Sequence, residues 1–213
     1  MIDIMKQEEM FLLISGLLKR KMTVYAIGGT AMMFHGFKNA TKDIDIVFFS
    51  EDDRLEFKRA LEEVGYKGYD SVQVYGRKEN QPIMLSRGSQ KEERFDLFSR
   101  DVIRFVFSEN MKKRATKTIE IGKNIVLKIA DPHDIIIMKC ATDRMKDKED
   151  ALSIIDKHGV DWDIVIDEAQ NQTGLGNKRA LFDLAEFVDD LIKMKAKISK
   201  KVLEKLIKTM EDQ

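Results

Sequence analysis

Two aspartates in one short apolar run, Asp43 and Asp45, are the residues best suited to chemistry in this sequence. They belong to residues 43–48 (DIDIVF), which we expect to form a strand. Because side chains alternate faces along a strand, at roughly 3.3 Å per residue, both carboxylates should share one face, roughly 6–7 Å apart at Cα. Two like charges so placed repel each other, and Mg²⁺ removes that repulsion because it binds carboxylates and phosphate oxygens. The spacing predicts a site for Mg²⁺ (or Mn²⁺).

A glycine pair ahead of this strand adds the features of a phosphate site. A short apolar strand breaks at Gly28, Gly29 and Thr30, and a short helical pattern follows over residues 31–34. Glycines without a Cβ let a phosphate approach the backbone, and a helix start offers free N–H groups to an anion. The Thr30 hydroxyl is a further donor. A metal-bound phosphate beside a helix start is typical of phosphoryl transfer.

A Gly-Gly-Ser/Thr turn, a short helix and then Asp-x-Asp on a strand resembles the DNA-polymerase-β-type nucleotidyltransferase superfamily. The segments GGTAMMFHG and ATKDIDIVF are most similar to minimal nucleotidyltransferases and to nucleotidyltransferase-type toxins of abortive-infection systems. The resemblance implies an α/β (α+β) fold, with a mixed β-sheet flanked by helices. It also implies Mg²⁺-dependent transfer of a nucleoside monophosphate from an NTP to an acceptor hydroxyl, with release of pyrophosphate.

The superfamily completes its metal site with a third carboxylate from a neighbouring strand, and Asp96 in RFDLF is the matching residue. Alternation turns Phe95 and Leu97 inward and Asp96 to the opposite face. The resemblance thus implies that Asp43, Asp45 and Asp96 are the catalytic metal ligands of a two-metal displacement, with Asp96 helping to deprotonate the acceptor. The alternative is an Asp96 that pairs with Arg94 or Arg100.

Residues 135–154, IIIMKCATDRMKDKEDALSI, resemble a later segment of the same family. There a lysine reaches the triphosphate and an aspartate supports the site, which implies Lys139 and Asp147 or Asp150. With Gly28, Gly29 and Thr30 these complete the nucleotide-binding set. The alternative is a lysine that extends its charged end to water, among surface charge pairs at helical spacing.

The sequence departs from the family pattern at two places. Thr30 stands where serine is commoner, which keeps the hydroxyl. An arginine often precedes the Asp-x-Asp, whereas residues 38–42 here offer only Lys38 and Lys42. A lysine is a point charge and cannot form the bidentate contact of a guanidinium.

Size and composition bound the remaining possibilities. The 213 residues suit a nucleotidyltransferase domain at 1–130 and a helical domain at 131–213. Basic and acidic residues balance at 37 each, so a globally basic nucleic-acid binder is not indicated. The single cysteine, Cys140, fits a reducing cytosol. No apolar run approaches the ~20 residues of a membrane span, and we expect a cytoplasmic protein.

Other segments predict the elements around these motifs. We expect a helix over residues 4–19, strands at 71–75 and 83–85, and a hairpin over 118–129. A basic cluster, Lys112-Lys113-Arg114, contacts a nucleic-acid backbone in one interpretation and is a solvated loop in the other.

The sequence leaves the acceptor open between tRNA or another RNA, a protein hydroxyl and a small molecule. A toxin–antitoxin pair, with an antitoxin as partner, is one setting that the resemblance implies. The alternative function is a catalytically silent nucleotidyltransferase fold that serves as a binding or regulatory protein.

Overall fold

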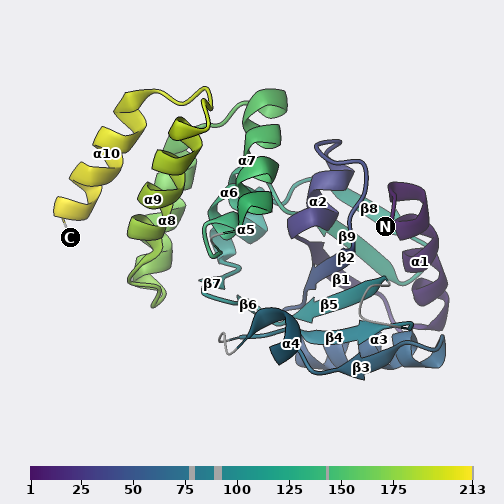
Figure 1. Ribbon diagram of the computed structural model, residues 1–213. Coiled ribbons are helices and arrows are strands. Elements are labelled where there is room, and N and C mark those ends of the chain that lie inside the picture. The colour runs from purple at the N-terminus through teal and green to yellow at the C-terminus, as the bar shows by residue number, and fades with distance from the viewer. Residues whose placement is uncertain (77–79, 89–92, 143, 213) are drawn as a thin grey trace. The chain divides into compact units, whose positions relative to one another are not determined.

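The computed structural model describes residues 1–76, 80–88, 93–142 and 144–212. The chain divides into two compact units, Met1–Asp131 and Pro132–Gln213. The first unit combines helices with strands, and the second contains helices (Figure 1). This confirms the expected mixed sheet flanked by helices and followed by a helical region.

The first unit contains, in chain order, α1 Ile4–Leu17, β1 Met22–Ala26, α2 Gly28–Phe34, β2 Asp43–Val47, α3 Glu51–Glu63, β3 Lys67–Tyr69, α4 Val72–Tyr75, β4 Ile83–Ser86, β5 Arg94–Phe98, β6 Asp101–Val102, β7 Phe105–Val106, α5 Glu109–Arg114, β8 Thr118–Ile121 and β9 Ile125–Ile129. Seven of these strands form a mixed sheet in the order β3-β4-β5-β2-β1-β9-β8, and β6 pairs with β7 separately. Two neighbouring pairs, β2 with β5 and β1 with β9, are parallel.

The centre of this sheet brings the candidate residues together. Strand β2 lies between β1 and β5, and its parallel register with β5 sets Asp45 opposite Asp96 and Asp43 opposite Arg94. Residues opposite each other on neighbouring strands point to the same face of a sheet. The four charged side chains therefore share one face.

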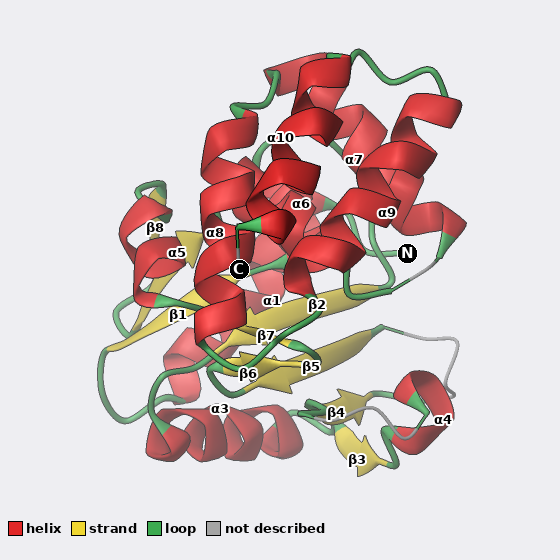
Figure 2. Ribbon diagram, turned by 90° about the vertical axis from the view of Figure 1, so that its left-hand side faces the viewer, coloured by secondary structure: helices red, strands yellow, loops and turns green. Residues whose placement is uncertain are grey.

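The other face of the sheet forms the core of the first unit. Ile44, Ile46 and Phe95 are fully buried, and the Phe95 ring lies 6.3 Å from that of Phe11 in α1 and 6.1 Å from that of Phe57 in α3. Figure 2 shows α3 running along the sheet. Burying these apolar side chains on one face fixes the register of β2 and β5, since a shift by one residue would turn the carboxylates inward.

The prediction of a strand at residues 71–75 is wrong, because Val72–Tyr75 forms the short helix α4. The Asp70 carboxylate accepts a hydrogen bond from the Val72 N–H at 2.9 Å, and the Ser71 carbonyl accepts one from the Tyr75 N–H at 2.8 Å. An aspartate that captures the backbone two residues on starts a turn. That local bonding outweighs the strand preference of valine and tyrosine.

The second unit contains α6 Pro132–Lys139, α7 Met145–His158, α8 Trp162–Gly174, α9 Ala180–Lys193 and α10 Lys200–Glu211. Helix α9 buries an apolar stripe at helical spacing, formed by Leu181, Leu184, Val188 and Leu191. In the described part of the chain, no helix is long and apolar enough to cross a membrane.

Candidate active site

Asp43 and Asp45 lie on the partly exposed face of β2, opposite the buried face of Ile44 and Ile46. The Asp43 side chain is 24% exposed, so it is accessible to a ligand. The alternating pattern of the sequence thus predicted correctly that both carboxylates lie on the same face of the strand.

Asp96 differs from these two because its side chain is completely buried. The guanidinium of Arg94 lies against it, with Nε 2.9 Å from Asp96 Oδ1 and Nη2 3.1 Å from Oδ2. Nη2 of Arg94 also lies 2.9 Å from Asp43 Oδ2. Arg94 therefore bridges two of the three carboxylates and offsets one of their two negative charges.

A third donor reaches Asp96 from α4. The Tyr75 hydroxyl donates a hydrogen bond of 2.6 Å to Asp96 Oδ2. Burial, and then the charge of Asp96, raise the pKa of Tyr75, so the phenol keeps its proton and remains a donor. Both oxygens of Asp96 are thus held in place.

The electrostatics of the pair follow from its burial. Burial raises the pKa of the Asp96 carboxyl, and the guanidinium of Arg94 opposes that change. Burial acts in the other direction on Arg94, but the nearby charge of Asp96 outweighs it and raises the pKa of Arg94. Arg94 stays positively charged at any physiological pH.

Gly28 lies against Asp45 at the start of α2. Its φ is +53°, and a Cβ added there would lie 2.7 Å from Asp45 Oδ2. A Cβ at Gly29 would lie 2.6 Å from the Thr41 hydroxyl oxygen. Packing within the chain therefore accounts for glycine at both positions, because α2 lies too close to β2 and to the residues before β2 to leave room for a Cβ.

Thr30 also bonds to this part of the chain. Its hydroxyl accepts a hydrogen bond from the Asp45 N–H at 2.9 Å and lies 3.5 Å from the Asp43 carbonyl oxygen. Thr30 is fully buried. The hydroxyl thus fixes the backbone that carries both aspartates.

A hard cation suits the donor chemistry of this face, because Asp43 and Asp45 supply carboxylate oxygens that are not completely buried. Across residues 1–76, 80–88, 93–142 and 144–212, however, no group of three or more His, Cys, Asp or Glu is arranged to hold a metal ion. Arg94 supplies the positive charge between Asp43 and Asp96. A cation that binds Asp43 therefore competes with an existing ion pair.

The other predicted nucleotide-binding residues belong to the second unit, where they bind one another. Lys139 Nζ donates hydrogen bonds of 2.7 Å to Asp147 and 2.6 Å to Asp150. Asp147 also accepts from Arg144 at 2.8 Å and from the Thr142 hydroxyl. Burial acts to lower the pKa of Lys139, but the two carboxylates outweigh it and raise that pKa. These contacts cross from α6 to α7 and stabilise the helix pair.

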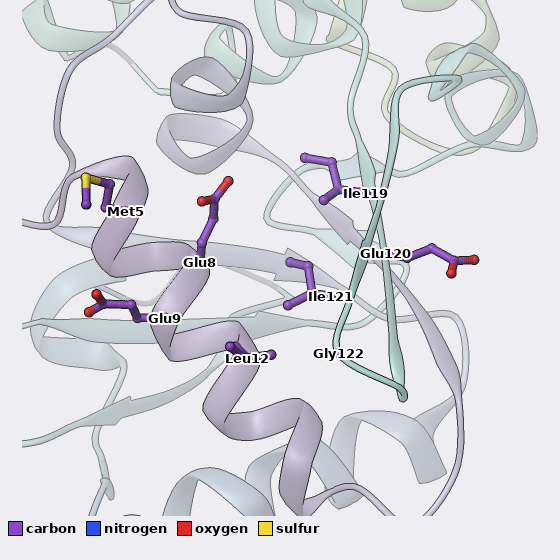
Figure 3. Close-up of a pocket in the computed structure, with 8 residues that line it drawn as sticks. All are labelled: Met5, Glu8, Glu9, Leu12, Ile119, Glu120, Ile121 and Gly122. Carbon is purple, nitrogen blue, oxygen red and sulfur yellow. The ribbon is translucent and has the colours of Figure 1, made fainter.

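A hollow of about 440 Å³ lies between α1 and β8 (Figure 3). Its walls combine apolar side chains such as Leu12 and Ile119 with the carboxylates of Glu8, Glu9 and Glu120. Glu120 points away from α1 in the close-up. Carboxylates repel phosphate groups, so this hollow does not extend a nucleotide site.

Sequence reasoning missed the contribution of Tyr75 and treated Arg94 only as part of an alternative. Arg94 precedes Asp96 by two residues in a strand, and that spacing places both on one face. The signal for Arg94 was therefore present. Tyr75 reaches Asp96 from a separate helix, which no local pattern reveals.

In a scan against protein-family models, residues 4–197 match the family described as "Nucleotidyltransferase of unknown function (DUF6036)". That range includes β2, β5 and the helices α6 to α8. A search of curated proteins gives no match.

Proposed function

The chain belongs to this family of nucleotidyltransferases, and on that premise we propose that it transfers a nucleoside monophosphate from an NTP to an acceptor hydroxyl. The acceptor oxygen forms a bond to the α-phosphorus, the bond from that phosphorus to the bridging oxygen of the β-phosphate breaks, and pyrophosphate leaves. The observation that carries this proposal is the register that sets Asp45 opposite Asp96, with Asp43 on the same face.

Each residue of the site has a proposed task. Asp43 and Asp45 hold Mg²⁺ or Mn²⁺, and the ion supplies positive charge to the triphosphate. The proposed task of Asp96 is to help deprotonate the acceptor hydroxyl, which requires one of its buried oxygens to exchange Arg94 or Tyr75 for the acceptor. The proposed contacts of Gly28, Gly29 and Thr30 with the β- and γ-phosphates, and those of Lys139, Asp147 and Asp150 with the nucleotide, rest on the sequence resemblance alone.

The ion pair between Arg94 and Asp43 determines how this site would open. The pair is partly exposed, at 13% and 24% of the two side chains, so solvent weakens it. An NTP brings its own negative charge and its metal ion. Arg94 can then leave Asp43 for a phosphate oxygen, because a guanidinium binds phosphate in the same bidentate manner as carboxylate.

The same ion pair favours a second candidate function, a catalytically silent nucleotidyltransferase fold that binds a partner. A site in which Arg94 stays permanently on Asp43 and Asp96 already has a cation between these carboxylates, and such a site can exist without a metal ion. The two candidates differ in whether Asp43 exchanges Arg94 for a cation.

The test is transfer of label from each α-labelled NTP to total RNA, lysate protein or small molecules, with Mg²⁺ or Mn²⁺. Asp45→Asn should abolish transfer, because the amide cannot supply the charge that the metal requires. The matched control is Asp52→Asn, an exposed aspartate in the first turn of α3, which should transfer at the wild-type rate. Absence of transfer by the wild type with every NTP and acceptor would favour the silent fold.

A toxin–antitoxin setting is part of the same proposal and rests on the similarity of GGTAMMFHG and ATKDIDIVF to abortive-infection toxins. Expression of the wild type in a bacterial host should then slow growth, and expression of Asp45→Asn should not. Equal growth with both proteins would argue against the toxin role and leave the transfer reaction open.

A further inference from the structure

A second hollow, of about 460 Å³, lies on the first unit and combines aromatic rings with lysines. Its walls include Tyr25 and Phe49 together with Lys21, Lys112 and Lys128. The lysines come from β9, from α5 and from the chain just before β1. Positive charge beside exposed aromatic surface is the combination with which proteins bind single-stranded nucleic acid.

Strand register places this hollow on the same sheet face as the carboxylates. Tyr25 lies opposite Val47 of β2 and beside Lys128 of β9, and Val47 shares the face of Asp43 and Asp45. Val47 follows Asp45 by two positions, which is roughly 7 Å along a strand. A strand of nucleic acid held in the hollow would therefore end near the proposed site of transfer.

The aromatic part of the hollow is a packed cluster with one accessible ring. The Tyr25 and Phe49 rings have centroids 5.2 Å apart, and each also packs on buried Phe107, at 5.3 and 6.1 Å. Phe49 remains partly exposed. The Lys112 ammonium lies 4.4 Å from the centre of the Phe49 ring. Packing against Tyr25 and Phe107 orients this ring, and a base that stacks on it would displace the Lys112 ammonium from the ring towards its phosphate.

Tyr25 provides the second observation. The residue is only 4% exposed and lines the hollow, and its hydroxyl forms no hydrogen bond within the described part of the chain. Burial, with a smaller contribution from Glu109, raises its pKa, so the hydroxyl keeps its proton. The hydroxyl oxygen is not one of the fully buried polar atoms that lack a partner, so it is accessible to solvent at the hollow, where a ligand oxygen or ring nitrogen can accept its hydrogen bond.

The lysines of the hollow are available for a phosphate. Lys21 binds Glu120 at 3.1 Å and Lys112 binds Glu109 at 3.5 Å, but these are exposed ion pairs of the kind that stabilise little. Lys128 forms no ion pair within the described residues. Phosphate oxygens can therefore replace weak partners at two lysines and meet a third that has none.

The one acidic wall residue of the hollow already has a cationic partner. Asp53 lies 2.6 Å from Arg20 Nη2, so its charge is compensated by a residue that does not line the hollow. Asp53 therefore does not neutralise the positive charge of the lysines that line the hollow.

We propose that this hollow binds a nucleotide unit of a single-stranded polynucleotide, with the base stacked on Phe49 and the phosphate held by Lys112 and Lys128. The acceptor of the proposed transfer is accordingly a nucleic-acid strand. This assignment of the acceptor rests on the proposed function, whereas the binding site itself does not. Lys112 belongs to the basic cluster that the sequence left undecided between a nucleic-acid contact and a solvated loop.

The test is fluorescence anisotropy with a labelled single-stranded 12-nucleotide RNA, using the full chain with Asp45→Asn so that no transfer occurs. Lys112→Ala should weaken RNA binding, and it should reduce the slope of log K against log salt concentration by about 1, as expected for the loss of one phosphate contact. Phe49→Leu should weaken it roughly 5- to 150-fold, the range for loss of one stacked base. The matched control is Lys113→Ala, which removes the same charge from the adjacent, exposed position of α5 and should bind as the parent does.

Three results would overturn the proposal. Equal weakening by Lys112→Ala and Lys113→Ala would mean general charge attraction without a defined site. Equally tight binding of a free mononucleotide would mean that the hollow takes a single nucleotide and not a strand. Absence of RNA binding would leave a protein surface as the remaining partner.

The outcomes also separate this inference from the proposed function. If the wild type transfers no nucleotide but RNA binding still depends on Lys112, the transfer reaction is refuted and the hollow stands. If transfer proceeds and Lys112→Ala leaves the KM for RNA unchanged, the hollow is refuted and the transfer reaction stands.

Discussion

Substitution of Gly28 by alanine tests whether the approach of α2 to β2 is needed for the carboxylate site. The residue has φ +53°, and an added Cβ would lie 2.7 Å from Asp45 Oδ2. A left-handed backbone costs a residue with a Cβ roughly 1–2 kcal/mol. Restoring an ordinary contact of 3.4 Å requires a movement of about 3.4 − 2.7 = 0.7 Å, and forcing Asp45 from its rotamer adds roughly 0.5–1.5 kcal/mol.

Gly36→Ala is the matched control, because Gly36 also has a left-handed φ, +75°, and an added Cβ there meets no described atom within 4 Å. Gly28→Ala should lower the free energy of unfolding by about 1.5–3.5 kcal/mol, and Gly36→Ala by about 1–2 kcal/mol. At roughly 2–4 °C per kcal/mol for a chain of this size, thermal unfolding resolves the difference.

The two variants should differ more in activity than in stability. Misplacement of a reacting group by about 1 Å can reduce the rate on the order of 100-fold, and Gly28→Ala moves a proposed metal ligand by a similar distance. Gly36→Ala should keep the wild-type rate of nucleotidyl transfer. Equal losses in both variants, or full activity of Gly28→Ala, would refute the reasoning.

Three further predictions concern the buried ion pairs. Arg94→Met should lower the free energy of unfolding in urea by about 3–5 kcal/mol, because it leaves Asp96 buried without its cation, and adding Asp96→Asn should recover part of that loss. Lys139→Met should cost a similar amount by leaving Asp147 without a cation that it contacts, whereas Lys178→Met at an exposed position should cost almost nothing. Burial acts to raise the pKa of Asp147, but Lys139 and the other donors outweigh it and lower that pKa from 3.8 to about 2. The charged Asp147 therefore contributes about 2 kcal/mol to the free energy of unfolding. This contribution is complete above pH 3.8 and is lost as the pH falls from 3.8 to about 2.

The controls decide each of these results. A wild-type stability for Arg94→Met would show that Asp96 does not need the guanidinium. Equal effects of Lys139→Met and Lys178→Met would contradict a structural role of the α6–α7 contacts. Acid unfolding curves should differ between the wild type and Asp147→Asn below pH 3.8, and curves with identical pH dependence would contradict the assignment to Asp147.

The sequence predicts the strands of the site well because their patterns are local. Alternation in residues 43–48 placed Asp43 and Asp45 on one face, and alternation around Phe95 and Leu97 placed Asp96 opposite the core. Both follow from the fixed period of two along a strand. The resemblance implied only that Asp96 lies on a strand next to that of Asp43 and Asp45. The order of the strands and the register of Asp45 with Asp96 were not predicted, since pairing between distant segments leaves no local trace.

The partners of the site residues were harder to predict. Tyr75 reaches Asp96 from a segment whose apolar pattern favoured a strand, but the local hydrogen bond that the Val72 N–H donates to the Asp70 carboxylate favours a turn there. The glycine pair was expected to admit a phosphate, yet Gly28 is already in close contact with Asp45. Such contacts depend on packing between elements, which a single sequence does not encode locally.

Whether Asp43 and Asp45 bind a metal–nucleotide complex is best measured by diffraction from crystals containing Mn²⁺ and a non-hydrolysable NTP analogue, using the anomalous signal of manganese. We predict a Mn²⁺ peak at the Asp43 and Asp45 carboxylates, with the ion pair between Arg94 and Asp43 opened. A nucleotide bound without Mn²⁺ at these residues, with Arg94 still on Asp43, would contradict the proposed transfer site.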